Sequence, residues 1–142
     1  MAETLIRLRD DVAADIAAVP LAAFLADPAQ LAVRIAPADD ARALLPRLDG
    51  VARVEIEFPA YTDGRGYSAA RLLREHGYRG ELRAVGDVLL DQISHMVRTG
   101  FDAFQPNQPL DRAAVDAAIA TWPAVYQRTV DGRAPIWALR HG

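Results

Sequence analysis

The chain has 142 residues, of which 51% are hydrophobic and 25% charged, a balance typical of one globular domain and not of a disordered chain. Its formal net charge is −3 and its 16 basic residues are all arginines, which disfavours nucleic-acid binding. The absence of cysteine excludes disulfides, thiolate nucleophiles and cysteine-held zinc or iron–sulfur sites within this chain.

The N-terminal segment does not have the pattern of a secretory signal. Charged residues occupy five of the positions between Glu3 and Asp11, where a secretory signal would need an apolar run. No apolar run approaches the ~20 residues that a membrane-spanning helix requires. We therefore expect a cytoplasmic protein that does not contact a membrane.

Short apolar runs alternate with helical patterns from residue 31 onward. The expected elements are strand 31–35, helix 41–48, strand 51–58, helix 66–76, strand 81–85, helix 87–99, a strand starting at 102–104, and helix 111–121. Before them we expect an edge strand at 4–8 and a short helix at 19–25, and after residue 123 an irregular strand or hairpin. Strands separated by such helices are typical of right-handed crossovers in a parallel sheet.

This order predicts a single α/β domain over residues 1–142, with four to five mainly parallel strands and flanking helices. A complete eight-fold barrel is excluded because it needs about 250 residues. An open doubly wound sheet is the first arrangement that fits. The second is a half-barrel that completes itself as a homodimer, with Trp122, Tyr126 and Trp137 either at the contact or in the core.

Ligands of parallel sheets bind beyond the carboxyl ends of the strands, so the loops that follow the expected strands are the candidate site. The polar residues of these loops are Asp63, Arg65, Tyr67, Ser68, Asp87 and Gln105. Because Gly64 and Gly66 flank an arginine just before a helix, backbone N–H groups and a guanidinium could face an anion there. The alternative is a glycine turn in which Asp63 or Ser68 caps the helix.

Gly64 to Ala69 also fits the dinucleotide pattern G-x-G-x-x-A. Residues 59–63 separate the first glycine from the strand, and the bulky Arg65 and Tyr67 would crowd a pyrophosphate, so we disfavour this interpretation.

Asp87 follows Gly86 at the start of a helix, so its first expected role is that of an N-cap. The sharper alternative is an acid/base pair formed by Asp63 and Asp87. His76, His95 and His141 have no metal-ligand spacing.

Two helices give further expectations. Arg71 and Arg74 are expected on the exposed side of helix 66–76. His95 falls on a mixed stripe between the apolar and polar faces of helix 87–99, a pattern that also suits a subunit contact.

The segment FPAYTDGRGYSAARLLREHGYRGELRAVGDVLLDQISHMVRTGFDAF, residues 58–104, resembles a bacterial family, the domain of unknown function numbered 934. Its DGRGYS and GELRAVGDVLLDQ blocks carry the resemblance. The matching signature positions are Asp63, Gly64, Arg65, Gly66, Tyr67, Ser68, Arg71, Arg83, Gly86, Asp87, Asp91 and Gln92. Members of this family are commonly labelled as oxidoreductases involved in sulfite reduction, because their genes lie beside sulfite reductase genes. The resemblance implies a pathway and no particular chemistry.

Two functions follow as hypotheses. The first is an accessory protein of assimilatory sulfite reduction that binds a small anion, or the reductase itself, through Gly64, Arg65, Gly66, Tyr67, Ser68 and Gln105. The second is a small acid/base enzyme that acts on an anionic or phosphorylated metabolite, with Asp63 and Asp87 as catalytic groups and Arg65 as the anion clamp. The residues identify no cofactor.

Overall fold

The computed structural model describes residues 2–9, 16–60 and 64–120. The elements of these residues are, in chain order, β1 (Ala2–Glu3), β2 (Ile6–Arg7), β3 (Val19–Pro20), α1 (Leu21–Ala26), β4 (Ala32–Ile35), the 3-10 helix η1 (Ala41–Gly50), β5 (Arg53–Phe58), α2 (Arg65–Glu75), β6 (Glu81–Gly86), the 3-10 helix η2 (Leu90–Gln92), α3 (Ile93–Thr99), β7 (Ala103–Pro106), β8 (Leu110–Asp111) and α4 (Arg112–Ala120).

Six strands form the main sheet, in the order β2-β7-β6-β5-β4-β3. The five strands from β3 to β7 are parallel and lie side by side in chain order, whereas β2 joins β7 antiparallel at the edge. The predicted α/β class with a mainly parallel sheet is confirmed, with more strands than expected. A doubly wound sheet reverses its strand order, whereas strands β3 to β7 follow one another in this sheet without a reversal.

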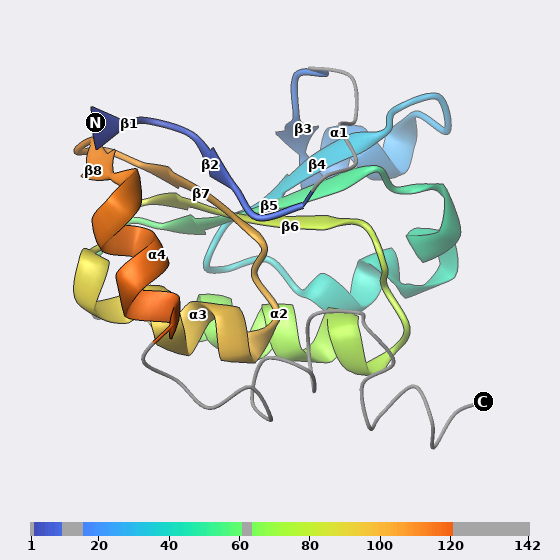
Figure 1. Cartoon of the computed structure of the whole chain (residues 1–142). Coiled ribbons are helices and arrows are strands. Elements are labelled where there is room, and N and C mark those ends of the chain that lie inside the picture. The colour runs from blue at the N-terminus through green and yellow to red at the C-terminus, as the bar shows by residue number, and fades with distance from the viewer. Residues whose placement is uncertain (1, 10–15, 61–63, 121–142) are drawn as a thin grey trace.

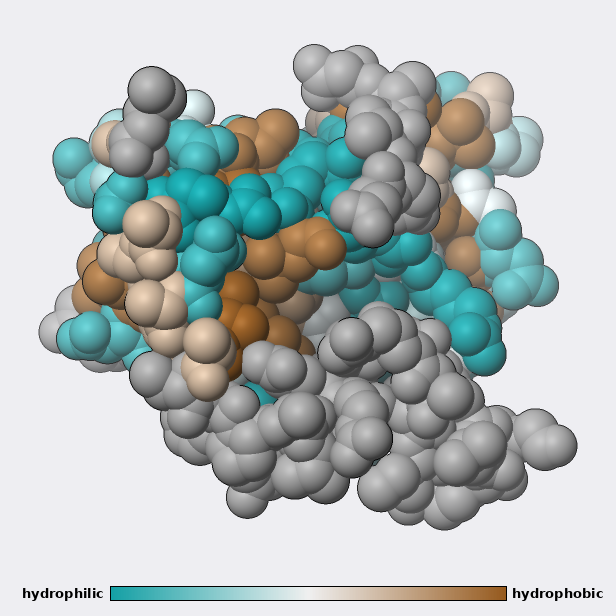
Figure 2. Space-filling model, viewed as in Figure 1, coloured by the Kyte–Doolittle hydropathy of each residue, from teal (hydrophilic) through white to brown (hydrophobic). Residues whose placement is uncertain are grey.

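The helices η1, α2 and α3 lie under the sheet in Figure 1. Strands β5 and β6 turn every second residue toward these helices. The sheet side of the hydrophobic core is formed by Val54, Ile56, Phe58, Leu82 and Ala84. Figure 2 shows the alanine-rich α4 at the left of the molecule as a pale brown surface. Among the described residues, no helix is long and apolar enough to cross a membrane.

Alternation along the same strands gives the other face of the sheet a charged character. Glu55 is 3% exposed and accepts hydrogen bonds from Arg34 at 2.6 Å and from Arg53 at 2.8 Å. Hydrophilic residues run along this upper side of the sheet in Figure 2. The carboxylate is buried at the centre of this group, and Arg34 is the more exposed partner, with 39% of its side chain accessible.

A second buried carboxylate extends this charged face toward β2. Glu81 is 2% exposed, and its two oxygens lie 2.5 Å from Arg7 Nη2 and 2.7 Å from Arg83 Nη2. Arg83 Nη1 also donates to Gln105 Oε1 on β7, at 3.2 Å. Opposite charges two residues apart in 53–55 and 81–83 therefore pair across and along the strands, which satisfies groups that would be costly to bury alone.

Three expected element boundaries are corrected by the structure. Residues 19–20 form β3, and the helix starts only at Leu21. Pro20, which lacks an N–H donor, is tolerated in β3 because this strand lies at the edge of the sheet. The helix expected at 41–48 is a 3-10 helix that spans Ala41–Gly50. The helix expected at 87–99 begins as η2 at Leu90, so Asp87 is not an N-cap.

Arg74 is also placed differently from the expectation. We expected an exposed side chain, but Arg74 is 7% exposed. Its guanidinium lies among backbone carbonyls and Asp102 at the start of β6 and β7, whereas Arg71, one turn earlier, is exposed as expected.

Candidate functional site

The carboxyl ends of β5 and β6 are held together by backbone hydrogen bonds. Phe58 and Gly86 are partners in the parallel register, and Asp87 N donates to Phe58 O at 2.7 Å. Asn107 N, just after β7, donates to Gly86 O at 2.8 Å. The loops that leave β5 and β6 therefore start side by side, as expected for neighbouring parallel strands.

Phe58 then fixes the start of α2. A Cβ atom on Gly66 would lie 2.5 Å from Phe58 Cζ and 3.1 Å from Ile56 Cγ2, so only glycine allows the helix to approach the strand so closely. The sequence places a glycine in the first turn of α2 for this packing contact. The glycine pair predicted as an anion loop therefore has a structural role at Gly66.

The next residue, Tyr67, bridges the sheet and α3. Its ring centroid lies 5.3 Å from that of Phe58, in an edge-to-face contact, and 4.7 Å from that of His95 on α3. Burial raises the pKa of the Tyr67 hydroxyl, so the hydroxyl stays protonated and can donate a hydrogen bond. Phe58, Tyr67 and His95 thus form a short series of aromatic contacts, from the buried Phe58 to the exposed His95.

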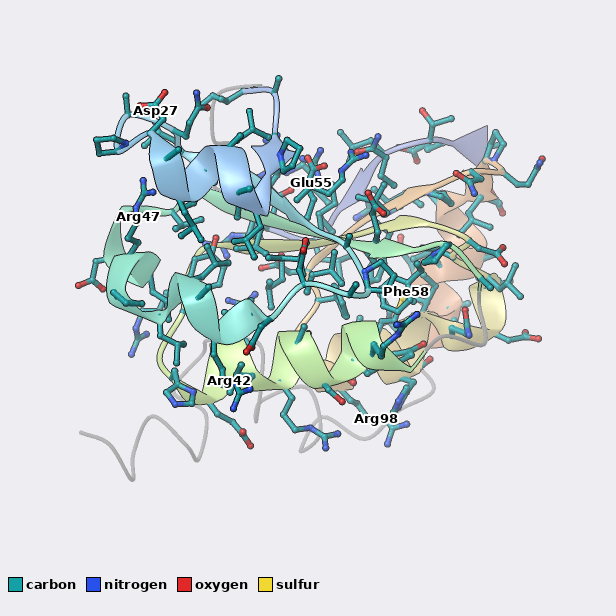
Figure 3. All side chains as sticks on the ribbon, turned by 180° about the vertical axis from the view of Figure 1, so that it is seen from behind. Asp27, Arg42, Arg47, Glu55, Phe58 and Arg98 are labelled. Carbon is teal, nitrogen blue, oxygen red and sulfur yellow. The ribbon has the colours of Figure 1, made fainter. Side chains whose placement is uncertain are left out.

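Two arginines complete this surface. Arg71 lies one helical turn after Tyr67, and Arg98 lies three residues after His95, with Arg98 Nη2 3.3 Å from His95 Nδ1. We call Tyr67, Arg71, His95 and Arg98 the basic cluster. Figure 3 shows Arg98 on the helical layer below the sheet edge that carries Phe58.

The charges of the basic cluster affect the pKa of His95. Partial burial is the largest cause that lowers the pKa of its imidazole, and the guanidiniums of Arg98 and Arg71 lower it further. Two positive side chains therefore act on the same point at the protein surface. Guanidinium groups bind oxyanions through paired N–H donors, so this arrangement is suited to a small oxyanion.

We expect the pKa of His95, followed by NMR as a function of pH, to lie below that of a free histidine side chain. Arg71→Gln and Arg98→Gln should each raise this pKa, because each removes a positive charge near the ring. Arg42→Gln is the control, since Arg42 is 72% exposed on η1 and pairs with Asp40. An unchanged pKa in both cluster variants would contradict this description of the site.

The remaining predicted site residues do not form one group. Gly64, Arg65 and Ser68 are exposed at the start of α2, and Ser68 lies inside the helix where it cannot cap it. Asp87 is half-buried after β6. Gln105 points to the opposite, charged face of the sheet. The second expected catalytic aspartate, at position 63, lies outside the described residues, so the acid/base pair stays a prediction.

Comparison with known proteins identifies the family. The family model described as "Bacterial protein of unknown function (DUF934)" matches residues 32–137. The chain belongs to this family. The match covers most of the chain and includes the whole basic cluster, so the resemblance seen in residues 58–104 is confirmed at the level of the family. Searches of the curated proteins and of the solved structures found no match.

In this DUF934 chain, the sequence identified Tyr67 as a site residue but missed the other members of the basic cluster. Arg71 was interpreted as a solvated side chain, and His95 as part of a mixed stripe. The available signal was spacing: Tyr67 and Arg71 are four residues apart, and His95 and Arg98 three, so each pair shares one helix face. Spacing along the chain does not predict that α2 contacts α3. This contact brings the two pairs together into one cluster.

The described part of the DUF934 chain holds no group of three or more His, Asp or Glu residues arranged to bind a metal ion. The carboxylates that converge are instead neutralised by arginines on the charged sheet face.

Proposed function

We propose that this DUF934 protein is an accessory protein of assimilatory sulfite reduction that binds a small oxyanion at the basic cluster. The site lies one helical turn along α2 from the loop that the sequence indicated. Binding there does not require a redox group or an acid/base pair. It requires only positive charge and hydrogen-bond donors in fixed positions, which the two helices supply.

The observation that carries the proposal is the state of Arg71. Within residues 64–120, Arg71 forms no ion pair and no hydrogen bond, although its charge acts on His95. Most other described arginines that face the protein, such as Arg53, Arg74 and Arg83, are engaged by carboxylates or carbonyls. Because an arginine in this position is available to a ligand, the cluster has a guanidinium to offer without breaking a structural contact.

The pathway part of the proposal is supported by the family resemblance, through the sulfite-reduction label that its members commonly carry. Sulfite is a small oxyanion, so the ligand that the cluster favours by charge is of the same chemical kind as the substrate of that pathway. The Tyr67 hydroxyl adds a neutral donor beside the guanidiniums, and the Phe58 ring beneath it keeps the tyrosine in place.

The test is deletion of the gene from a bacterium that carries it, followed by growth on sulfate, sulfite or sulfide as sole sulfur source. We expect poor growth on sulfate and sulfite and normal growth on sulfide, because only the first two need the reductase. The wild-type gene and Arg42→Gln should restore growth, and the double variant Arg71→Gln, Arg98→Gln should not.

Three outcomes of this test decide for or against the proposal. Normal growth of the deletion strain on sulfate overturns the pathway assignment. Complementation by Asp87→Asn supports a binding role, whereas loss of complementation by Asp87→Asn, with the double arginine variant still active, would favour the acid/base enzyme.

A further inference from the structure

We propose that the ligand of the basic cluster is a dianionic oxyanion, and that its binding brings one proton from solvent into the protein at His95. This inference rests on the proposed function, since it concerns the same cluster, and it adds the charge of the ligand and a proton to the binding step.

The contact between Arg98 and His95 fixes the starting state. Arg98 Nη2 lies 3.3 Å from His95 Nδ1. A guanidinium carries only N–H donors, so the bond requires His95 Nδ1 to accept. The imidazole is therefore neutral in the unliganded protein, with its single proton on Nε2. A doubly protonated ring would place two donors against each other at this distance.

Among the residues that the structure describes, the charged and titratable groups that act on His95 come from α2 and α3. From α2 they are Tyr67, whose ring lies against the imidazole, and Arg71. From α3 the group is Arg98. Asp91, four residues before His95 in η2, is exposed to solvent. The two guanidiniums lower the pKa of His95 together with its burial, so the surroundings are positive before a ligand binds.

A dianion reverses this balance. When Arg98 donates to the ligand, it no longer donates to Nδ1, and that nitrogen becomes free to take a proton from water. Two guanidinium charges are then matched by two negative charges, so the imidazolium is no longer repelled and its new N–H also faces the anion. A monoanion leaves one positive charge unmatched, and the ring then stays neutral. The number of negative charges on the ligand thus determines whether a proton is taken up.

The experiment is isothermal titration calorimetry of the full chain with sulfate at pH 7, in two buffers that differ in ionisation enthalpy. Sulfate keeps both charges throughout the relevant pH range, so every proton taken up enters the protein. We expect the observed enthalpy to depend on the buffer, with a slope that corresponds to net proton uptake. The affinity should also rise as the pH falls from 8 toward the pKa of the free His95, by up to about tenfold per pH unit.

Two controls separate the possible results. His95→Gln keeps a polar side chain of similar length beside Tyr67 but cannot take up the proton, so its binding should be weaker and independent of the buffer. Nitrate, a planar monoanion, should bind wild-type protein more weakly and without proton uptake.

Failure of this inference can be told apart from failure of the proposed function. Sulfate binding with the same enthalpy in both buffers overturns the proton uptake and leaves the oxyanion site standing. Equal proton uptake by wild type and His95→Gln overturns the assignment to His95. The absence of any sulfate or sulfite binding overturns both the site and the inference.

Discussion

Replacing Arg74 by leucine should lower the free energy of unfolding by about 3–5 kcal/mol, the range measured when one partner of a buried ion pair is removed. Arg74 donates to Gly100 O, Tyr78 O and Gly80 O, each at 2.9 Å, and to Asp102 Oδ2 at 3.1 Å. Leucine would leave these acceptors at the junction of α2, β6 and α3 without their donor. Buried carbonyls and a carboxylate that lose a hydrogen bond carry the full cost of desolvation.

The size of this effect follows from burial. Burial lowers the pKa of the Arg74 guanidinium and raises the pKa of the Asp102 carboxyl, although each is opposed by the charge of the other. The contact between the two groups therefore stabilises the charged form of each. Asp102 also accepts a hydrogen bond from Leu82 N at 2.9 Å. Arg9 Nη1, which lies 2.9 Å from Asp102 Oδ2, limits the loss at the carboxylate, whereas the three carbonyls lose the donor that Arg74 supplies.

Urea unfolding followed by circular dichroism measures the effect. Arg71→Leu is the matched control, because it is exposed on the same helix three residues earlier and should change the free energy of unfolding by no more than about 0.5 kcal/mol. A loss below 1 kcal/mol in Arg74→Leu would show that Arg74 does not join α2 to the two strands.

Gly86→Ala should also be strongly destabilising, by about 2–4 kcal/mol. Gly86 has a φ of +113°, a region that side chains with a Cβ rarely occupy, and its Cβ would lie 2.5 Å from Phe58 O. The clash is with backbone, so no side-chain rotation relieves it. The same carbonyl accepts from Asp87 N, and its displacement would break the link between β5 and β6 at their carboxyl ends.

This substitution should affect the basic cluster as well as stability. Moving Phe58 disturbs the ring on which both Gly66 and Tyr67 rest, so we expect weaker oxyanion binding even in the folded fraction. Gly50→Ala is the control, since Gly50 ends η1 without a positive φ and a Cβ there meets nothing within 4 Å. Thermal unfolding and sulfate titration of both variants provide the measurements. Equal stability of Gly86→Ala and Gly50→Ala would contradict the strain argument.

The periodicity of apolar residues was sufficient to predict most helices and strands, because each element buries one face and its apolar residues recur at the spacing of that face. The partly alternating pattern in 51–58 and the short run in 81–85 predicted two central strands, and the pattern at 66–76 predicted α2. The strand order was not accessible in this way. Chain-order and reversed arrangements have the same succession of strands and helices, and only the side on which each helix crosses distinguishes them.

The errors have physical causes at particular residues. Asp87 was expected to cap a helix, but the positive φ of Gly86 turns the chain, and the helix starts only at Leu90. Arg74 was placed in solvent because charged side chains are usually exposed, and no local pattern reveals carbonyls from residues that lie 4 to 26 positions away.

The candidate site also has one part that the local sequence pattern indicated and one part that only tertiary packing creates. The sequence placed Tyr67 among its candidate residues, because two glycines around an arginine just before a helix mark the segment that contains it. It could not join Arg71 to His95, since they are brought together by packing of α2 on α3 and not by sequence distance.

The most direct measurement of the central claim is an NMR titration of isotope-labelled protein with sulfite, with sulfate in parallel. If the basic cluster binds the oxyanion, the side-chain signals of Arg71, His95 and Arg98 should shift together with one dissociation constant, and the Tyr67 ring should follow. The double variant Arg71→Gln, Arg98→Gln should show no such shifts. Shifts confined to Gly64 and Arg65, or to the charged face around Arg34, would place the ligand elsewhere and contradict the account.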